Sequence, residues 1–162
     1  MAGTVAIGIQ QFNEIRKKGY FYIDKTAFIR EWWEKGDSVT LITRPRRFGK
    51  TLTMSMVEQF FSVKYAGQQN LFEGLAIWET KAYREIQGTY PVISLSFANL
   101  KEPSYELTRQ KVCDQLQQLY TEQAYILESG ILKGADKSFF ERMLHNEKVE
   151  YVDATLALYK LS

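Results

Sequence analysis

The sequence has 162 residues, which is enough for one modest domain with a hydrophobic core. Hydrophobic residues make up 45% and charged residues 25%, a composition typical of globular proteins that argues against a disordered chain. The formal net charge is only +2, from 21 basic and 19 acidic residues, so no global positive field marks a nucleic-acid-binding protein. Any basic patch must be local.

The sequence contains one cysteine and one histidine, and this limits the available chemistry. Cys113 cannot form an internal disulfide, fits a reducing compartment, and lies in a helical stretch where a buried thiol is expected rather than a nucleophile. His145 has no histidine or cysteine cluster beside it, so no transition-metal site is expected. The N-terminus lacks the order of a signal peptide and no apolar run is long enough to cross a bilayer. We expect a cytoplasmic protein without membrane contact.

The first 38 residues predict an N-terminal helical block. Asp24 is placed to cap a helix over 25–35. The apolar residues expected to be buried by this helix are Phe28, Ile29 and Trp32 or Trp33.

Residues 39–64 predict a strand, a loop and a helix. The strand, 39–43, reads Val-Thr-Leu-Ile-Thr and is too apolar for a surface strand. After the loop, Leu52, Met56 and Phe60 recur at helical spacing. The next segment, 65–89, is irregular and aromatic, and is interpreted as an insertion.

Residues 90–162 predict a second buried strand followed by helices. The strand is 90–97, and a long helix is expected over 105–127. A capping box at 138–141 is expected to open a short helix. The spacing of Val152, Leu156 and Tyr159 predicts a last helix that runs into the C-terminus. Strands joined by a long helical connection favour an α/β fold: a parallel sheet flanked by helices, here incomplete because only two strands are found.

The segment between the first strand and its helix has the chemistry of a phosphate-binding loop. Gly49 would let the backbone pass close to phosphate oxygens, Lys50 would reach the β- and γ-phosphates, and the Thr51 hydroxyl would ligate Mg²⁺. The predicted nucleotide-binding residues are Arg44, Pro45, Arg46, Arg47, Phe48, Gly49, Lys50, Thr51 and Leu52, with Lys50 as the catalytic residue. The predicted ligands are ATP and Mg²⁺.

Arg44 stands where the motif has its first glycine. Pro45 biases Arg44 toward an extended backbone, so an L-residue is acceptable there if its φ is negative. Arg46 and Arg47 add positive charge beside the polyphosphate. The competing interpretation is a chance Gly-Lys-Thr on a solvated basic turn.

The run 42–52 resembles the P-loop of the bacterial AAA-ATPase-like family, and is similar to loops of the wider archaeal-type and STAND-like ATPases. Residues 7–12, 19–26 and 90–97 also resemble blocks of that family, so the resemblance covers nearly the whole chain. It implies a P-loop NTPase-like domain that binds ATP. Arginine in place of the first glycine is itself a feature of the family.

The resemblance also implies a Walker B strand that ends in an acidic pair, and no such run is found; Asp153 leads into a predicted helix. We therefore expect an N-terminal piece that ends before the third strand, with little or no turnover of its own, and an ATPase in the full-length protein. The resemblance implies as partner the downstream part of the same polypeptide, with a domain similar to PD-(D/E)XK nucleases. An incomplete sheet would expose a strand edge, so self-association with a second copy of the chain is also expected.

Three functions stay open on sequence grounds. The first is an ATP-binding module that couples nucleotide binding or hydrolysis to an unknown effector. The second is a non-catalytic nucleotide sensor or interaction module. The third is a nucleic-acid-binding domain that uses Arg44, Arg46 and Arg47 on the phosphate backbone. The segment Asp24-Lys25-Thr26 either shapes a base pocket or simply caps a helix.

Overall fold

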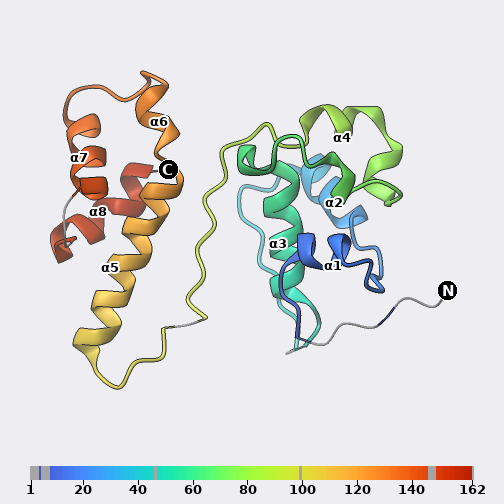
Figure 1. The fold of residues 1–162 in the computed structure, drawn as a ribbon, viewed down its shortest axis with the longest axis horizontal. Helices are drawn as coiled ribbons and strands as arrows, with labels where there is room; N and C mark the ends of the chain where they lie inside the picture. Colours follow the sequence, from blue (N-terminus) through green and yellow to red (C-terminus); the bar gives the residue numbers. More distant parts are fainter. Residues whose placement is uncertain (1–3, 5–7, 46, 99, 146–148, 162) are drawn as a thin grey trace. The chain divides into compact units, whose positions relative to one another are not determined.

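The computed structural model describes residues 4, 8–45, 47–98, 100–145 and 149–161. The chain divides into two compact units, unit 1 (Met1–Val92) and unit 2 (Ile93–Ser162). Both units are helical (Figure 1). No helix in the described part of the chain is long and apolar enough to cross a membrane.

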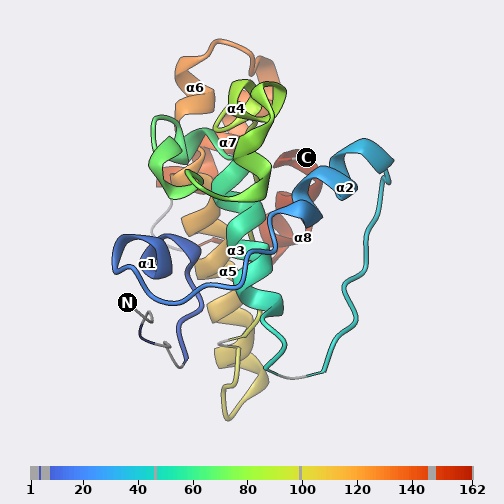
Figure 2. The same cartoon turned by 90° about the vertical axis from the view of Figure 1, so that its right-hand side faces the viewer.

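Unit 1 is built around one central helix, α3. Figure 2 shows the segment from α2 to α3 as a long arc between the two helices. The described elements of this unit are α1 (Phe12–Lys17), α2 (Ala27–Lys35), α3 (Lys50–Phe61), η1 (Val63–Tyr65), η2 (Gln69–Leu71), η3 (Ala76–Glu79) and α4 (Lys81–Ile86), where η denotes a 3₁₀ helix.

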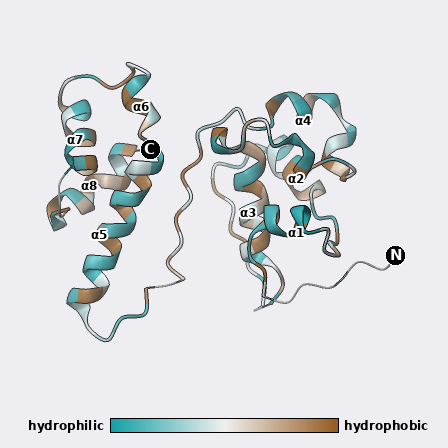
Figure 3. Cartoon of the chain, in the orientation of Figure 1, coloured by the Kyte–Doolittle hydropathy of each residue, from teal (hydrophilic) through white to brown (hydrophobic). Residues whose placement is uncertain are grey.

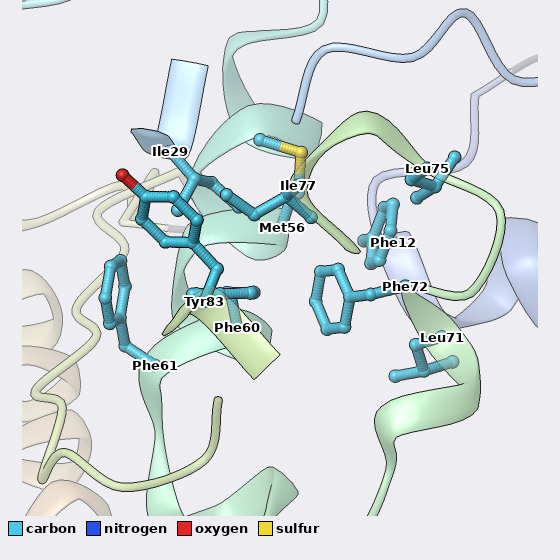
Figure 4. Close-up of a cluster of buried hydrophobic side chains, with 10 residues drawn as sticks. All are labelled: Phe12, Ile29, Met56, Phe60, Phe61, Leu71, Phe72, Leu75, Ile77 and Tyr83. Atoms are coloured by element: carbon cyan, nitrogen blue, oxygen red, sulfur yellow. The ribbon is translucent and has the colours of Figure 1, made fainter. Parts of the chain in front are cut away.

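The core of unit 1 is aromatic and surrounds α3 (Figure 4). The ring of Phe72 stacks on Phe12 and meets Phe60 edge-on, with ring centroids 5.1 Å apart in both pairs. The predicted helix after the loop is confirmed, because Met56 and Phe60 are fully buried on one face of α3. Aromatic pairs of this kind add about 0.5–1.5 kcal/mol beyond the area they bury.

The segment 65–89, expected to be an insertion, is part of this core. It folds into η2, η3 and α4, and it buries Leu71, Phe72, Leu75 and Ile77. Short 3₁₀ turns have neither the 3.6-residue nor the two-residue repeat, so the apolar residues of this segment show no period in the sequence.

Unit 2 is a small helical assembly formed by α5 (Tyr105–Glu122), α6 (Tyr125–Glu128), α7 (Gly134–His145) and α8 (Tyr151–Leu161). Hydrophilic and hydrophobic residues alternate along α5 (Figure 3), whose buried face packs against α7 and α8. The Tyr120 hydroxyl donates to the carbonyl of Ala157 at 2.7 Å. The guanidinium of Arg142 on α7 donates twice to the carboxylate of Asp153 on α8.

The expected parallel sheet is wrong. Residues 39–43 and 90–97 form no strand, and among the described residues the only β pairing is an isolated parallel bridge between Ser62 and Tyr90. Val39 and Leu41 are 85% and 83% exposed. A β-branched, apolar run suits a pleated and covered surface, yet it forms a strand only where a neighbouring strand pairs with its main chain. A P-loop fold built on a sheet is therefore not what these residues form.

Two predicted helix boundaries also need correction. The long helix ends at Glu122, and α6 begins a few residues later. Ser138 does not open a helix, because α7 begins at Gly134. On α8 the buried residues are Asp153 and Ala157. The apolar residues whose spacing predicted this helix, Val152, Leu156 and Tyr159, are 66%, 44% and 79% exposed.

Candidate phosphate-binding loop

The chain enters α3 through a turn that contains two left-handed residues. Gly49, with φ 74° and ψ 23°, immediately precedes the helix. Arg47 has φ 70° and, of the residues that the structure describes, is the only non-glycine with a positive φ. Left-handed backbone costs an L-residue about 1–2 kcal/mol. Such residues occur in turns that bind anions and gather at functional sites.

The side chain of Lys50 folds back over this turn. Its Nζ donates to the carbonyl oxygens of Arg44, at 2.5 Å, and Pro45, at 3.0 Å. Lys50 is the first residue of α3, so its side chain joins the exit of the loop to the entrance. The Lys50 ammonium group is therefore held by main-chain carbonyl oxygens of the loop.

The other predicted loop residues are spread over this turn and the first turn of α3. Arg44 is exposed and, unlike Arg47, lies outside the left-handed region, as the sequence required. Phe48 is 61% exposed, Thr51 is exposed and Leu52 packs against the core of unit 1. Arg46 lies outside the described residues.

The amino end of α3 adds to the positive potential of the loop. The N–H of Thr53 donates to the carbonyl oxygen of Gly49 at 2.8 Å. The first N–H groups of any helix have no partner within the helix, and no described side chain caps this end. Exposed N–H groups and the helix dipole favour an anion there.

A lysine from outside the motif also contacts the loop. Lys25 Nζ lies 3.4 Å from the carbonyl oxygen of Phe48, and 3.4 Å from the position that a Cβ would take at Gly49. The main-chain N–H of Lys25 donates to the Tyr22 hydroxyl at 3.4 Å, and that hydroxyl in turn donates to the sulfur of Met56 on α3. Sequence reasoning offered the segment of Lys25 for a base pocket or a helix cap, and did not predict this contact with Phe48 and Gly49.

Asp24 fixes the segment that carries Lys25. One carboxylate oxygen accepts the N–H of Thr26 at 2.8 Å and its hydroxyl at 2.7 Å, and the other accepts the N–H of Ala76 at 2.7 Å. Thr26 is fully buried, and its hydroxyl oxygen accepts the N–H of Ile77 at 3.1 Å. Asp24 is therefore not the N-cap of α2, as was expected: the helix begins at Ala27, two residues later than predicted, and its N-cap is Thr26.

These contacts change the acidity of Asp24. Partial burial alone would raise the pKa of its carboxyl. The hydrogen bonds from Ala76 and Thr26, together with the charge of Arg16, outweigh burial and hold the pKa below its usual value. Burial raises the pKa of the neighbouring Tyr22 hydroxyl to about 12. Near neutral pH, Asp24 is thus an ionised acceptor and Tyr22 an intact phenol.

The remaining chemical candidates form no second site in the described part of the chain. No group of three histidine, cysteine or acidic residues there could hold a metal ion. Cys113 is buried in the core of unit 2. Asp153, the acid considered for a Walker B element, lies in α8 and pairs with Arg142 at 2.8 Å.

Comparison with known proteins bears directly on this loop. A family model described as a predicted AAA-ATPase matches residues 6–156, which include the loop and its flanking helices. The chain belongs to this predicted AAA-ATPase family. Membership supports a nucleotide-binding, ATPase-like role in general terms, and it confirms the resemblance found in the sequence.

The AAA-ATPase-like chain is also similar to the "Uncharacterized protein in vnfD 5'region" of Azotobacter chroococcum mcd 1. The two are 38% identical over 92 residues, which is 56% of this chain and 16% of the relative. The chain thus covers a small part of that protein's length. No solved structure matches the chain.

Proposed function

We propose that residues 44–52 bind the polyphosphate of Mg-ATP, as the nucleotide-binding module of an AAA-ATPase-like protein. The observation that carries this proposal is the position of Lys50. Its ammonium group donates to the carbonyl oxygens of Arg44 and Pro45, across a turn with left-handed residues at the amino end of α3. A polyphosphate offers the same ammonium group stronger, charged acceptors.

The residues of the loop fit such a ligand. Gly49 has no Cβ that would narrow the space beneath Lys25, and the amino end of α3 offers N–H donors. Lys50 would neutralise charge on the outer phosphates, and the Thr51 hydroxyl would hold the metal. Bound Mg²⁺ would neutralise part of the phosphate charge. In this arrangement the chain's own residues bind and orient the nucleotide.

Positive charge at the loop supports an anionic ligand. Within the described residues, the cationic side chains of this site have no carboxylate partner. They are Lys25, Arg44, Arg47 and Lys50. Like charges held close together repel one another, and a polyphosphate would remove that repulsion.

Two further functions use the same loop. As a non-catalytic sensor, the module would bind ATP or ADP without hydrolysis. As a nucleic-acid-binding surface, exposed Arg44 and Arg47 would contact backbone phosphates. ATP hydrolysis, a downstream nuclease-like domain and self-association belong to the proposal for the whole protein, because the chain spans 16% of the relative it matches.

Thermal unfolding with ligands tests the proposal. The 162-residue chain is melted alone, with Mg-ATP, with Mg-ADP and with a short DNA duplex, as wild type, Lys50→Ala and Lys81→Ala. Lys81 is a matched control in unit 1, since its side chain is 82% exposed and forms only a surface ion pair with Glu85. A ligand at 100 times its Kd stabilises the folded state by about 2.7 kcal/mol.

We expect Mg-ATP to raise the Tm of wild type and Lys81→Ala, and to have no effect on Lys50→Ala. DNA-dependent stabilisation at low salt, with no response to nucleotide, would instead assign the arginines to nucleic acid. An unchanged Tm with every ligand would contradict the proposal outright. Hydrolysis assays on the full-length protein then separate an ATPase from a sensor.

A further inference from the structure

We propose that Lys25 is a second phosphate-binding lysine of this loop and contacts the polyphosphate directly. This inference rests on the proposed nucleotide-binding function. Lys25 lies outside the Gly-Lys-Thr motif, 24 residues before Gly49 in the sequence. The ligand class that it recognises is a polyphosphate, free or as part of a nucleotide.

The first argument is position. Lys25 Nζ lies at the carbonyl of Phe48 and above the Cα of Gly49, the part of the loop that approaches phosphate most closely in the proposed site. Its contact with Phe48, at 3.4 Å, is long for a hydrogen bond to an ammonium group. The ammonium group can therefore leave this carbonyl for a phosphate oxygen at little cost.

The second argument is rigidity on both sides of an exposed side chain. Asp24 and Thr26, the two neighbours of Lys25, are bound to the main chain of Ala76 and Ile77, about fifty residues further along. The Lys25 N–H also lies 3.4 Å from the Tyr22 hydroxyl, a long contact that adds little to these two anchors. The backbone of Lys25 is thus fixed before any ligand arrives, which lowers the entropy lost on binding. Asp24 and Thr26 are positioning residues for Lys25.

The third argument is the chemistry of the group. An ammonium ion has three donors, no acceptor and a compact charge, which suits phosphate oxygens. A base edge presents donors as well as acceptors, and an ammonium group cannot satisfy the donors. These properties favour phosphate over the base-pocket role that the sequence left open for this segment.

Binding measurements with two probes separate these roles. Kd values for Mg-ATP and for inorganic tripolyphosphate with Mg²⁺ are measured by calorimetry at fixed ionic strength, on the 162-residue chain. The variants are Lys25→Ala, Lys25→Arg, Lys50→Ala and the control Lys81→Ala. The Tm of each variant without ligand reports folding, and Lys25→Gln replaces Lys25→Ala if the alanine variant does not fold.

We expect Lys25→Ala to weaken both probes by a similar factor, roughly 10- to 100-fold, as for loss of a hydrogen bond to a charged group. Lys25→Arg should retain most of the affinity, and Lys81→Ala all of it. Asp24→Asn keeps only one of the two acceptor oxygens, so it should weaken the binding of both probes, but less than Lys25→Ala does. In the double variant, Asp24→Asn should not change the Kd values of Lys25→Ala any further.

Two results would overturn the proposed role of Lys25 and leave the proposed nucleotide-binding function intact. In one, Lys25→Ala weakens Mg-ATP but not tripolyphosphate, which would place Lys25 at the base or ribose. In the other, Lys25→Ala binds both probes like wild type while Lys50→Ala binds neither, so that the loop stands without Lys25. If wild type binds neither probe, or Lys50→Ala binds both normally, the proposed function itself fails.

Discussion

Two residues of the loop, separated by Phe48, share a left-handed backbone but differ in the free energy that this backbone costs. Gly49, with φ 74°, adopts it freely because it has no Cβ, whereas Arg47, with φ 70°, adopts it under strain. The left-handed backbone at position 49 therefore explains why the motif has a glycine there. The strain at Arg47 has no such local explanation, and an arginine there is best explained by its charge.

Gly49→Ala should destabilise unit 1. The added Cβ meets only Lys25 Nζ, at an ordinary contact distance, so the cost comes from the backbone. We expect the free energy of unfolding to fall by about 1–2 kcal/mol, measured by urea denaturation. A stability equal to that of wild type would show that the turn readjusts without cost.

Arg47→Gly should have the opposite effect on stability. Removing the left-handed strain gains about 1–2 kcal/mol, and the greater freedom of glycine in the unfolded chain offsets about 0.5–1 kcal/mol of it. We expect the variant to unfold at the same or a slightly higher urea concentration than wild type. A loss of more than about 1 kcal/mol would mean that the arginine side chain, rather than its backbone, stabilises the loop.

At the scale of elements, hydrogen bonds to one carboxylate join the segment before α2 to the start of η3. Acid should weaken this junction. The pKa of Asp24 is lowered in the folded state, so its contribution to stability is fully present above the ordinary value of 3.8 and is lost as pH falls through the lower, folded pKa.

We therefore expect the unfolding free energy of wild type to fall below about pH 4 more steeply than that of Asp24→Asn. Both are measured by denaturation between pH 3 and pH 7. Asp37→Asn is the control, because Asp37 only pairs with Lys35 at the surface. Parallel pH profiles for wild type and Asp24→Asn would show that this carboxylate is not linked to folding.

In unit 2, the pair between α7 and α8 should matter more than a second pair between the same helices. The side chain of Asp153 is 13% exposed and accepts two hydrogen bonds from Arg142, whereas Lys160 and Asp136 form a more exposed pair. We expect Asp153→Ala to cost about 1.5–3 kcal/mol and Lys160→Ala no more than about 1 kcal/mol. Equal losses in denaturation would contradict this ranking.

Local patterns predicted the elements whose formation is itself local. The helical spacing of Leu52, Met56 and Phe60 fixed α3 and its buried face. The two predicted strands failed the same reasoning, because strand formation depends on a partner strand that composition does not reveal. The spacing of apolar residues also predicted α8, but the residues that the structure buries on this helix are Asp153, which pairs with Arg142, and Ala157.

Some residues of the candidate site could likewise be predicted from local sequence, and others could not. Gly49, Lys50 and Thr51 could be proposed as phosphate-binding residues from their order in the sequence, because the motif has a defined spacing. The contact of Lys25 with the loop could not be predicted from a motif. It depends on the hydrogen bond from the N–H of Ala76 to Asp24, and these two residues are 52 positions apart. A main-chain donor leaves no trace in the amino-acid sequence.

At the scale of the whole molecule, each unit has its own core, and at each core burial raises the pKa of a tyrosine to about 12. Tyr22 packs against the core of unit 1 and Tyr120 lies in that of unit 2. Burial raises the pKa of each hydroxyl from 10.0 to about 12. The two units therefore share a response to alkali although their cores are separate.

Alkali should weaken both units over the same range of pH. Below pH 10 both hydroxyls are protonated in the folded and unfolded states, so stability does not depend on them. Between pH 10 and about 12 the unfolded chain loses these protons first, which stabilises it and lowers the free energy of unfolding. Tyr22→Phe and Tyr120→Phe should each remove part of this decline, measured by urea denaturation at pH 9 and pH 11. Tyr159→Phe is the control because Tyr159 is 79% exposed. An alkaline decline of the same size in all three variants and in wild type would assign it to other groups.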